Sequence, residues 1–244
     1  MEQDGLGARV KRALAPLAGF LALVVKLKSV LFIGSMAVSV AAYAQLWGWR
    51  YAAGFVALIF VHELGHVVAL RIRGIRAHAL VFIPLLGAFT SWQPTERRPY
   101  QEAETALAGP ILGTIGALAL AEYGHVNGSG LLRALAFTGL LINLFNLIPL
   151  VPLDGGRVAN LLYPWVWAAV GLGLIGYLVV RPKPLVVVAL LLVGYELYRQ
   201  VRHPDAERDQ VEPRLRIRLS VTYLVLIVAI VVGMHATYLA RTLR

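Results

Sequence analysis

The chain has 244 residues, 59% of them hydrophobic, a mean hydropathy of +0.71 and a net charge of +10. An ordinary soluble domain is about 45–50% apolar, so a soluble core cannot bury this much apolar surface. Charged residues make up 15% of the chain and lie in short stretches between long apolar runs, as in an integral membrane protein.

The positive charge does not indicate a nucleic-acid partner, because basic residues confined to short loops are also what membrane topology produces. The sequence contains none of the motifs that are typical of nucleic-acid binding. Cysteine is absent, which excludes disulfides and thiolate metal sites. Any metal must therefore be held by His, Asp or Glu.

The elements predicted in chain order are an amino-terminal interfacial helix over residues 13–25, then apolar segments of about the 20 residues needed to cross a bilayer. These segments are residues 29–48, 51–70, 103–121, 131–150, 158–180, 185–198 and 219–239. The sixth is short, so we expect six to seven transmembrane helices in an all-α polytopic protein of the cell membrane.

The segment at residues 79–92 follows the second predicted span and is apolar, but it is too short to cross a bilayer. Pro84 and Gly87 lie near its middle and favour a chain reversal. The pattern predicts a re-entrant β-hairpin, since non-helical backbone at membrane depth must be buried or line a cavity. An apolar interfacial loop is the alternative.

The orientation follows from the basic residues on alternate sides of the seven spans. One side carries 17 of the 23 Lys and Arg residues and the other carries 6. Because cytoplasmic loops are enriched in Lys and Arg, we predict a cytoplasmic amino terminus and a carboxyl terminus outside.

The second predicted span contains His62-Glu63-Leu64-Gly65-His66, a His-Glu-x-x-His motif. The two imidazoles fall at i and i+4 on one helix face, where both can bind one ion, and zinc suits such ligands. Glu63, next to that face, can take a proton from a bound water. A charged side chain at the bilayer centre costs about 2.5–3.5 kcal/mol, so a metal site is favoured over a structural pairing of these residues.

A third ligand is expected in the stretch from residue 143 to 157, where Asp154 lies among apolar residues. Pro149 and Pro152 should end the fourth span, and Gly155-Gly156 allows a tight turn. The second and fourth spans both run inward, so His62, His66 and Asp154 should meet on the cytoplasmic side. The alternative for Asp154 is a helix cap.

The motif at residues 62–66 and the Leu-Asp-Gly-Gly at residues 153–156 together resemble the two signatures of the site-2 protease family of intramembrane metalloproteases. The resemblance covers roughly residues 51–170. It implies a three-helix catalytic core, with His62, His66 and Asp154 binding Zn²⁺ and Glu63 as general base. It also implies that Asn146 binds substrate or stabilises the transition state, whereas the residues alone allow a helix–helix hydrogen bond with Asn143.

The third predicted span carries Ala108-Gly109-Pro110, which resembles the Gly-Pro element of that family. Close helix packing is the alternative role for the glycines of this span, Gly109, Gly113 and Gly116.

The chain divides into an amino-terminal interfacial segment and first span at residues 1–50, a catalytic membrane core at 51–170 and carboxyl-terminal spans at 171–244. The resemblance implies hydrolysis of peptide bonds in or near transmembrane segments of a membrane-protein substrate. A catalytically silent scaffold of the same fold and a divalent-metal transporter are the competing interpretations. The sequence does not predict the substrate's identity or the oligomeric state.

Overall fold

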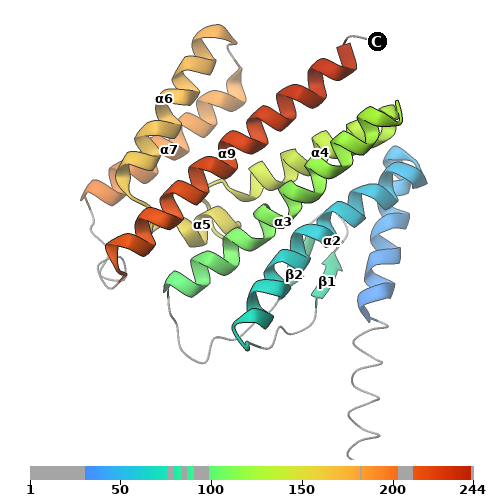
Figure 1. Ribbon diagram of the computed structural model, residues 1–244, viewed down its shortest axis with the longest axis horizontal. Helices are drawn as coiled ribbons and strands as arrows, with labels where there is room; N and C mark the ends of the chain where they lie inside the picture. The colour runs from blue at the N-terminus through green and yellow to red at the C-terminus, as the bar shows by residue number, and fades with distance from the viewer. Residues whose placement is uncertain are drawn as a thin grey trace, which may run out of the picture.

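The computed structural model describes residues 31–75, 80–83, 87–90, 99–181, 183–202 and 211–242 (Figure 1). The interfacial helix predicted at residues 13–25 lies outside the described residues. So do residues 203–210 of the basic loop before the last predicted span.

Each predicted span corresponds to an apolar helix. The helices are Leu31–Trp47, α2 (Trp49–Ile72), α3 (Pro99–Val126), α4 (Gly130–Asn146), α6 (Pro164–Val180), α7 (Pro184–Arg202) and α9 (Pro213–Thr242). In the described part of the chain, α2, α3, α7 and α9 are long and apolar enough to cross a membrane, and the other three are apolar but shorter. The described residues are therefore mostly helical with four candidate spans, and a count of six to seven stays a prediction.

Two boundaries of the predicted spans are wrong. The fourth helix ends at Asn146 and not at residue 150, because the prolines that follow cannot continue it. The fifth span was predicted from residue 158, but the short helix α5 (Asp154–Ala159) ends before α6 begins at Pro164. Proline suits the first turn of a helix and disfavours helical backbone in the residue before it, which separates the two helices.

Helix α3 is central in the packing: it contacts α2, α4, α5 and α9. In Figure 1 the helices α2, α3 and α4 run side by side, and α6 and α7 form a pair at the side of α9 away from α2. The largest apolar core contains residues of every labelled helix, including Leu58, Leu107, Leu140, Trp167 and Tyr223.

Glycines set the closeness of these helices. A Cβ on Gly65 of α2 would lie 2.2 Å from the carbonyl oxygen of Ala108 on α3. A Cβ on Gly113 of α3 would lie 2.3 Å from the amide oxygen of Asn143 on α4. Membrane helices approach closely where residues are small, so the packing role considered for the glycines of α3 holds at Gly113.

Strands β1 (Leu80–Ile83) and β2 (Gly87–Thr90) form an antiparallel pair in which Leu80 lies opposite Thr90 and Ile83 opposite Gly87. The pair falls within the segment predicted as a hairpin, and β2 contacts α2. The other residues of the segment, 79, 84–86 and 91–92, lie outside the described residues. The re-entrant position of this segment in the membrane stays a prediction.

Candidate metal centre

Helix α2 places two buried imidazoles together. His62 and His66 are one helical turn apart and are 4% and 9% exposed. Their Nε2 atoms lie 3.2 Å apart. Spacing of i and i+4 puts both side chains on one helix face, as the motif predicts.

Asp154 joins this pair from a segment 92 residues away from His62. Its Oδ2 atom lies 3.1 Å from Nε2 of His62 and 3.3 Å from Nε2 of His66, and the residue is 7% exposed. The structure thus brings the three predicted ligands together in what we call the ligand triangle: His62 Nε2, His66 Nε2 and Asp154 Oδ2. As the first residue of α5, Asp154 makes no side-chain cap, since the cap position belongs to Leu153.

The turn that delivers Asp154 requires glycine after it. A Cβ on Gly155 would lie 2.2 Å from the carbonyl oxygen of Leu147, and one on Gly156 would lie 2.6 Å from the backbone of Leu150. The first turn of α5 therefore packs directly on the backbone that leaves α4. The Gly-Gly pair, predicted to allow a tight turn, lets the backbone of α5 pack closely against residues 147–150.

The hydrogen bond made by Nδ1 of each histidine places a proton on that nitrogen. Nδ1 of His66 lies 2.8 Å from the carbonyl oxygen of Thr105, which can only accept, so this nitrogen donates. Nδ1 of His62 lies 2.8 Å from Oδ1 of Asn143, whose Nδ2 donates to the carbonyl of Gly139. A neutral imidazole held in this way turns the electron pair of its Nε2 toward Asp154, and such partners of the second nitrogen are usual for metal ligands.

The ligand triangle fits a zinc ion. With both imidazoles neutral, their lone pairs and the carboxylate oxygen are three acceptors within 3.3 Å of one another, an arrangement that a proton or a metal ion among them stabilises. Zinc bonds of about 2.0–2.2 Å in a tetrahedron separate neighbouring ligand atoms by roughly 3.3–3.6 Å. Three protein ligands with a fourth position open is the composition of a catalytic zinc site.

Glu63 is a second carboxylate at this centre. It is 8% exposed, and a carboxylate oxygen of Glu63 and one ring nitrogen each of His62 and His66 all lie within 4.8 Å of one another. It neighbours His62 in sequence, whereas Asp154 makes the close contacts with both imidazoles. Glu63 is thus within reach of a small group bound at the triangle.

Helix α3 closes the centre through a residue that the sequence prediction treated only as a packing glycine or a family element. A Cβ on Gly109 would lie 2.3 Å from Nε2 of His66 and 2.9 Å from Nε2 of His62. The next residue, Pro110, is inside the helix and has no N–H to donate to the carbonyl of Ala106. The adjacent carbonyl, of Thr105, is the one that accepts from His66. The Gly-Pro pair in a spanning segment was the signal for this contact.

A group of side chains from α7 and α9 holds the segment that carries Asp154. Gln200 donates to the carbonyl of Ala159 at 2.6 Å, and Nε of Arg216 donates to the carbonyl of Leu161 at 3.1 Å. Arg199 donates to the amide oxygen of Asn160, and Tyr223 donates to the carbonyl of Leu147. We call the four donor residues the α5 anchor: Arg199, Gln200, Arg216 and Tyr223. These donors meet acceptors at and just beyond the carboxyl end of α5 and on the backbone that leaves α4, so α7 and α9 hold the segment around α5 in place.

The two asparagines of α4 lie differently with respect to the ligand triangle. Asn143 is 2% exposed and contacts His62, as described above, which the sequence prediction missed. Asn146 is half-buried, and its Nδ2 donates to the carbonyl of Ile142 at 3.0 Å. The structure describes no contact between Asn146 and the ligand triangle.

Comparisons with known proteins cover the part of the chain that carries the two histidines. Residues 50–128, which include α3 and all but the first residue of α2, match the model of peptidase family M50. The zinc metalloprotease MJ0392 of Methanocaldococcus jannaschii is 30% identical over 118 residues, covering 46% of this chain and 33% of that protein.

Two further relatives are described by their names as presumed zinc metalloproteases. Rip3 of Mycobacterium tuberculosis is 32% identical over 139 residues, 52% of this chain and 35% of Rip3. The sll0528 protein of Synechocystis is 33% identical over 120 residues, 47% of this chain and 31% of that protein.

The chain thus spans about a third of the length of the curated relatives that it matches. The matched region contains the His-Glu-x-x-His motif and the glycine of α3 that lies against it. Zinc is the metal that these relatives and the buried His-Glu-His group imply. Residues 50–128 therefore match peptidase family M50, the site-2 protease family, and the relatives similar to this part of the chain are named as zinc metalloproteases.

Proposed function

We propose that this protein hydrolyses peptide bonds in or near the transmembrane segments of membrane-protein substrates. His62, His66 and Asp154 would hold Zn²⁺, and Glu63 would act as general base. The observation that carries the proposal is the ligand triangle, with donor atoms 3.1–3.3 Å apart in a buried site between candidate membrane helices.

When bound, zinc supplies Lewis acidity that polarises a carbonyl group and acidifies a water molecule. The Glu63 carboxylate accepts the proton of the attacking water and later donates it to the leaving amine. Asn143 and the carbonyl of Thr105 keep each imidazole in the tautomer whose Nε2 faces the centre. The apolar core around α3 excludes bulk water, which strengthens these electrostatic interactions.

A substrate must offer an extended backbone at this site, because a helix keeps its amides in internal hydrogen bonds. The β1–β2 pair lies against α2, the helix of the two histidines. An unwound substrate segment would add to this pair as a further strand, a common mode of peptide binding.

The test of the function joins metal content to cleavage. Purified protein is expected to contain about one zinc per chain, and Asp154→Ala to lower that content because only two protein ligands remain. Cleavage of single-span membrane proteins, followed by mass spectrometry of the fragments, should fall with it. A metal-loaded wild-type protein that cuts none of a broad panel would instead favour the silent scaffold or the metal transporter.

Asn143 and Asn146 are expected to differ in effect. Asn143→Ala leaves Nδ1 of His62 without its acceptor, so zinc affinity should fall by about 10–100-fold, as for other loosened ligand supports. Asn146→Ala should keep wild-type affinity and lower turnover, as proposed for a residue that meets substrate or the developing oxyanion. Competition with a zinc chelator measures affinity, and wild-type turnover by Asn146→Ala would remove that residue from the site.

The proposed orientation has the amino terminus and the metal centre toward the cytoplasm, on the strength of the 17-to-6 division of basic residues. A reporter enzyme inserted within residues 203–210 should be active inside the cell, and one after Arg244 should be active outside. The inverse pattern would reverse the topology, and an inside carboxyl terminus alone would change the number of spans.

A further inference from the structure

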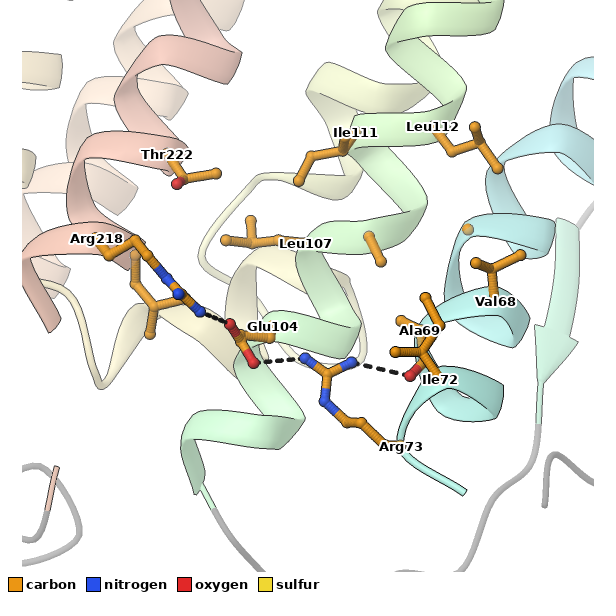
Figure 2. Close-up of a pocket in the computed structure, with 13 residues that line it drawn as sticks. Val68, Ala69, Ile72, Arg73, Glu104, Leu107, Ile111, Leu112, Arg218 and Thr222 are labelled. Atoms are coloured by element: carbon orange, nitrogen blue, oxygen red, sulfur yellow. Dashed lines mark hydrogen bonds and ion pairs between the residues drawn. The ribbon is translucent and has the colours of Figure 1, made fainter. Parts of the chain in front are cut away.

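A groove separate from the ligand triangle opens between α2, α3 and α9, with a volume of about 550 Å³ (Figure 2). This volume is in the range of sites that bind small molecules. The lining residues that matter here are Val68 and Ile72 from α2, Arg73 at its carboxyl cap, Glu104, Leu107 and Ile111 from α3, and Arg218 from α9.

One end of the groove carries an excess of positive charge. The Glu104 carboxylate accepts from the guanidinium of Arg73 and from that of Arg218 (Figure 2), so one negative charge faces two positive ones. The Arg218 side chain is 62% exposed in spite of this contact. Arg214, also exposed, lies one turn before Arg218 on the same face of α9. Donors and net positive charge therefore remain available at this end.

The rest of the groove is apolar and accessible. Val68 is 42% exposed and Ile72 is 80% exposed, and Figure 2 shows Ile72 beside Arg73, and Val68, Leu107 and Ile111 farther from the charged group. Ile111 lies seven residues after Glu104, which in a helix is a rise of about 10 Å. The apolar wall thus extends from the charged end along helices that are long enough to cross the membrane.

We propose that this groove binds an anionic phospholipid, with the phosphate at Arg218 and Arg73 and an acyl chain along the apolar wall. An acyl chain fits an apolar groove inside a bilayer, because the wall offers water no hydrogen-bond partners. Guanidinium groups bind phosphate oxygens in paired hydrogen bonds, and basic pockets between membrane helices bind lipid head groups in this way. The charged end and the apolar wall match the head and tail of such a lipid in order.

The groove also touches the surroundings of the metal centre from outside. Its lining includes Gly65 and Ala108, the residues directly before His66 and Gly109. A bound lipid would therefore pack against the α2–α3 contact on which the position of His66 depends.

The experiment uses the full chain in uncharged detergent with phosphatidylglycerol or phosphatidylcholine of identical acyl chains. Native mass spectrometry should show preferential retention of phosphatidylglycerol. Arg218→Gln should weaken that binding by about fivefold, the effect of one arginine near an anionic head group. Arg50→Gln removes the same charge from an exposed residue away from the groove and should leave binding unchanged.

A second variant tests the acyl-chain half of the site. Val68→Trp places a large side chain in the groove at its apolar wall and should reduce binding. Val225→Trp makes the same change at an exposed position of α9 outside the groove lining and should leave binding unchanged. Equal retention of both lipids, or unchanged binding by Arg218→Gln and Val68→Trp, would overturn the proposal. Retention of inorganic phosphate alone with the same affinity would also overturn it, in favour of a simple anion site.

Discussion

Replacing Glu63 with Gln is expected to leave zinc content near that of the wild type and to lower cleavage of a transmembrane substrate by about 10²–10⁴-fold. The variant keeps the size of the side chain and some hydrogen bonding but removes the proton acceptor. The ligand triangle does not include Glu63, so metal binding should persist. Paired zinc analysis and single-turnover cleavage measure both quantities.

The two readouts separate the possible roles of Glu63. Loss of zinc together with activity would make Glu63 a ligand. Undiminished cleavage by Glu63→Gln would remove general-base catalysis by this residue. A control is Glu122→Gln, because Glu122 is an exposed carboxylate on α3 that should affect neither measurement.

Gly109→Ala is expected to have an effect of similar size through a different cause. The added Cβ would lie 2.3 Å from Nε2 of His66, so either the imidazole or α3 must move by about an ångström to restore normal contact. A displacement of that size at a reacting centre can cost about 10²-fold in rate. Both zinc affinity and cleavage should therefore fall, unlike the result for Glu63→Gln.

The matched control for Gly109→Ala is Gly173→Ala in α6. A Cβ at Gly173 meets nothing within 4 Å, so this change adds the same methyl group to a helix without a contact. Wild-type zinc affinity and turnover in Gly109→Ala would show that α3 does not approach the ligands as closely as described.

The three residues of the ligand triangle could be predicted from the sequence because each lies in a recognisable local pattern. His62 and His66 share a helix face by spacing alone, and Asp154 is conspicuous as a carboxylate among apolar residues before Gly-Gly. Their meeting followed from two spans that run in the same direction. Positions of the helices could be predicted too, since long apolar runs mark them.

The contacts that support the triangle could not be predicted in this way. Asn143 and Asn146 are three residues apart on one helix, and their relation to His62 depends on the rotation of α4 against α2, which the sequence pattern does not specify. The role of Gly109 likewise depends on the distance between α2 and α3.

The end of α5 before Pro164 could have been predicted, because proline disfavours helix in the residue before it.

The α5 anchor has a consequence for the biogenesis of the protein. The two histidines belong to a helix that is synthesised early, but the segment bearing Asp154 is held by side chains of α7 and α9, which leave the ribosome later. A nascent chain that has inserted only through α6 lacks the donors from Gln200, Arg216 and Tyr223. We therefore expect the ligand triangle to reach its final arrangement only after α9 has entered the membrane, and the proposed proteolytic activity to arise no earlier.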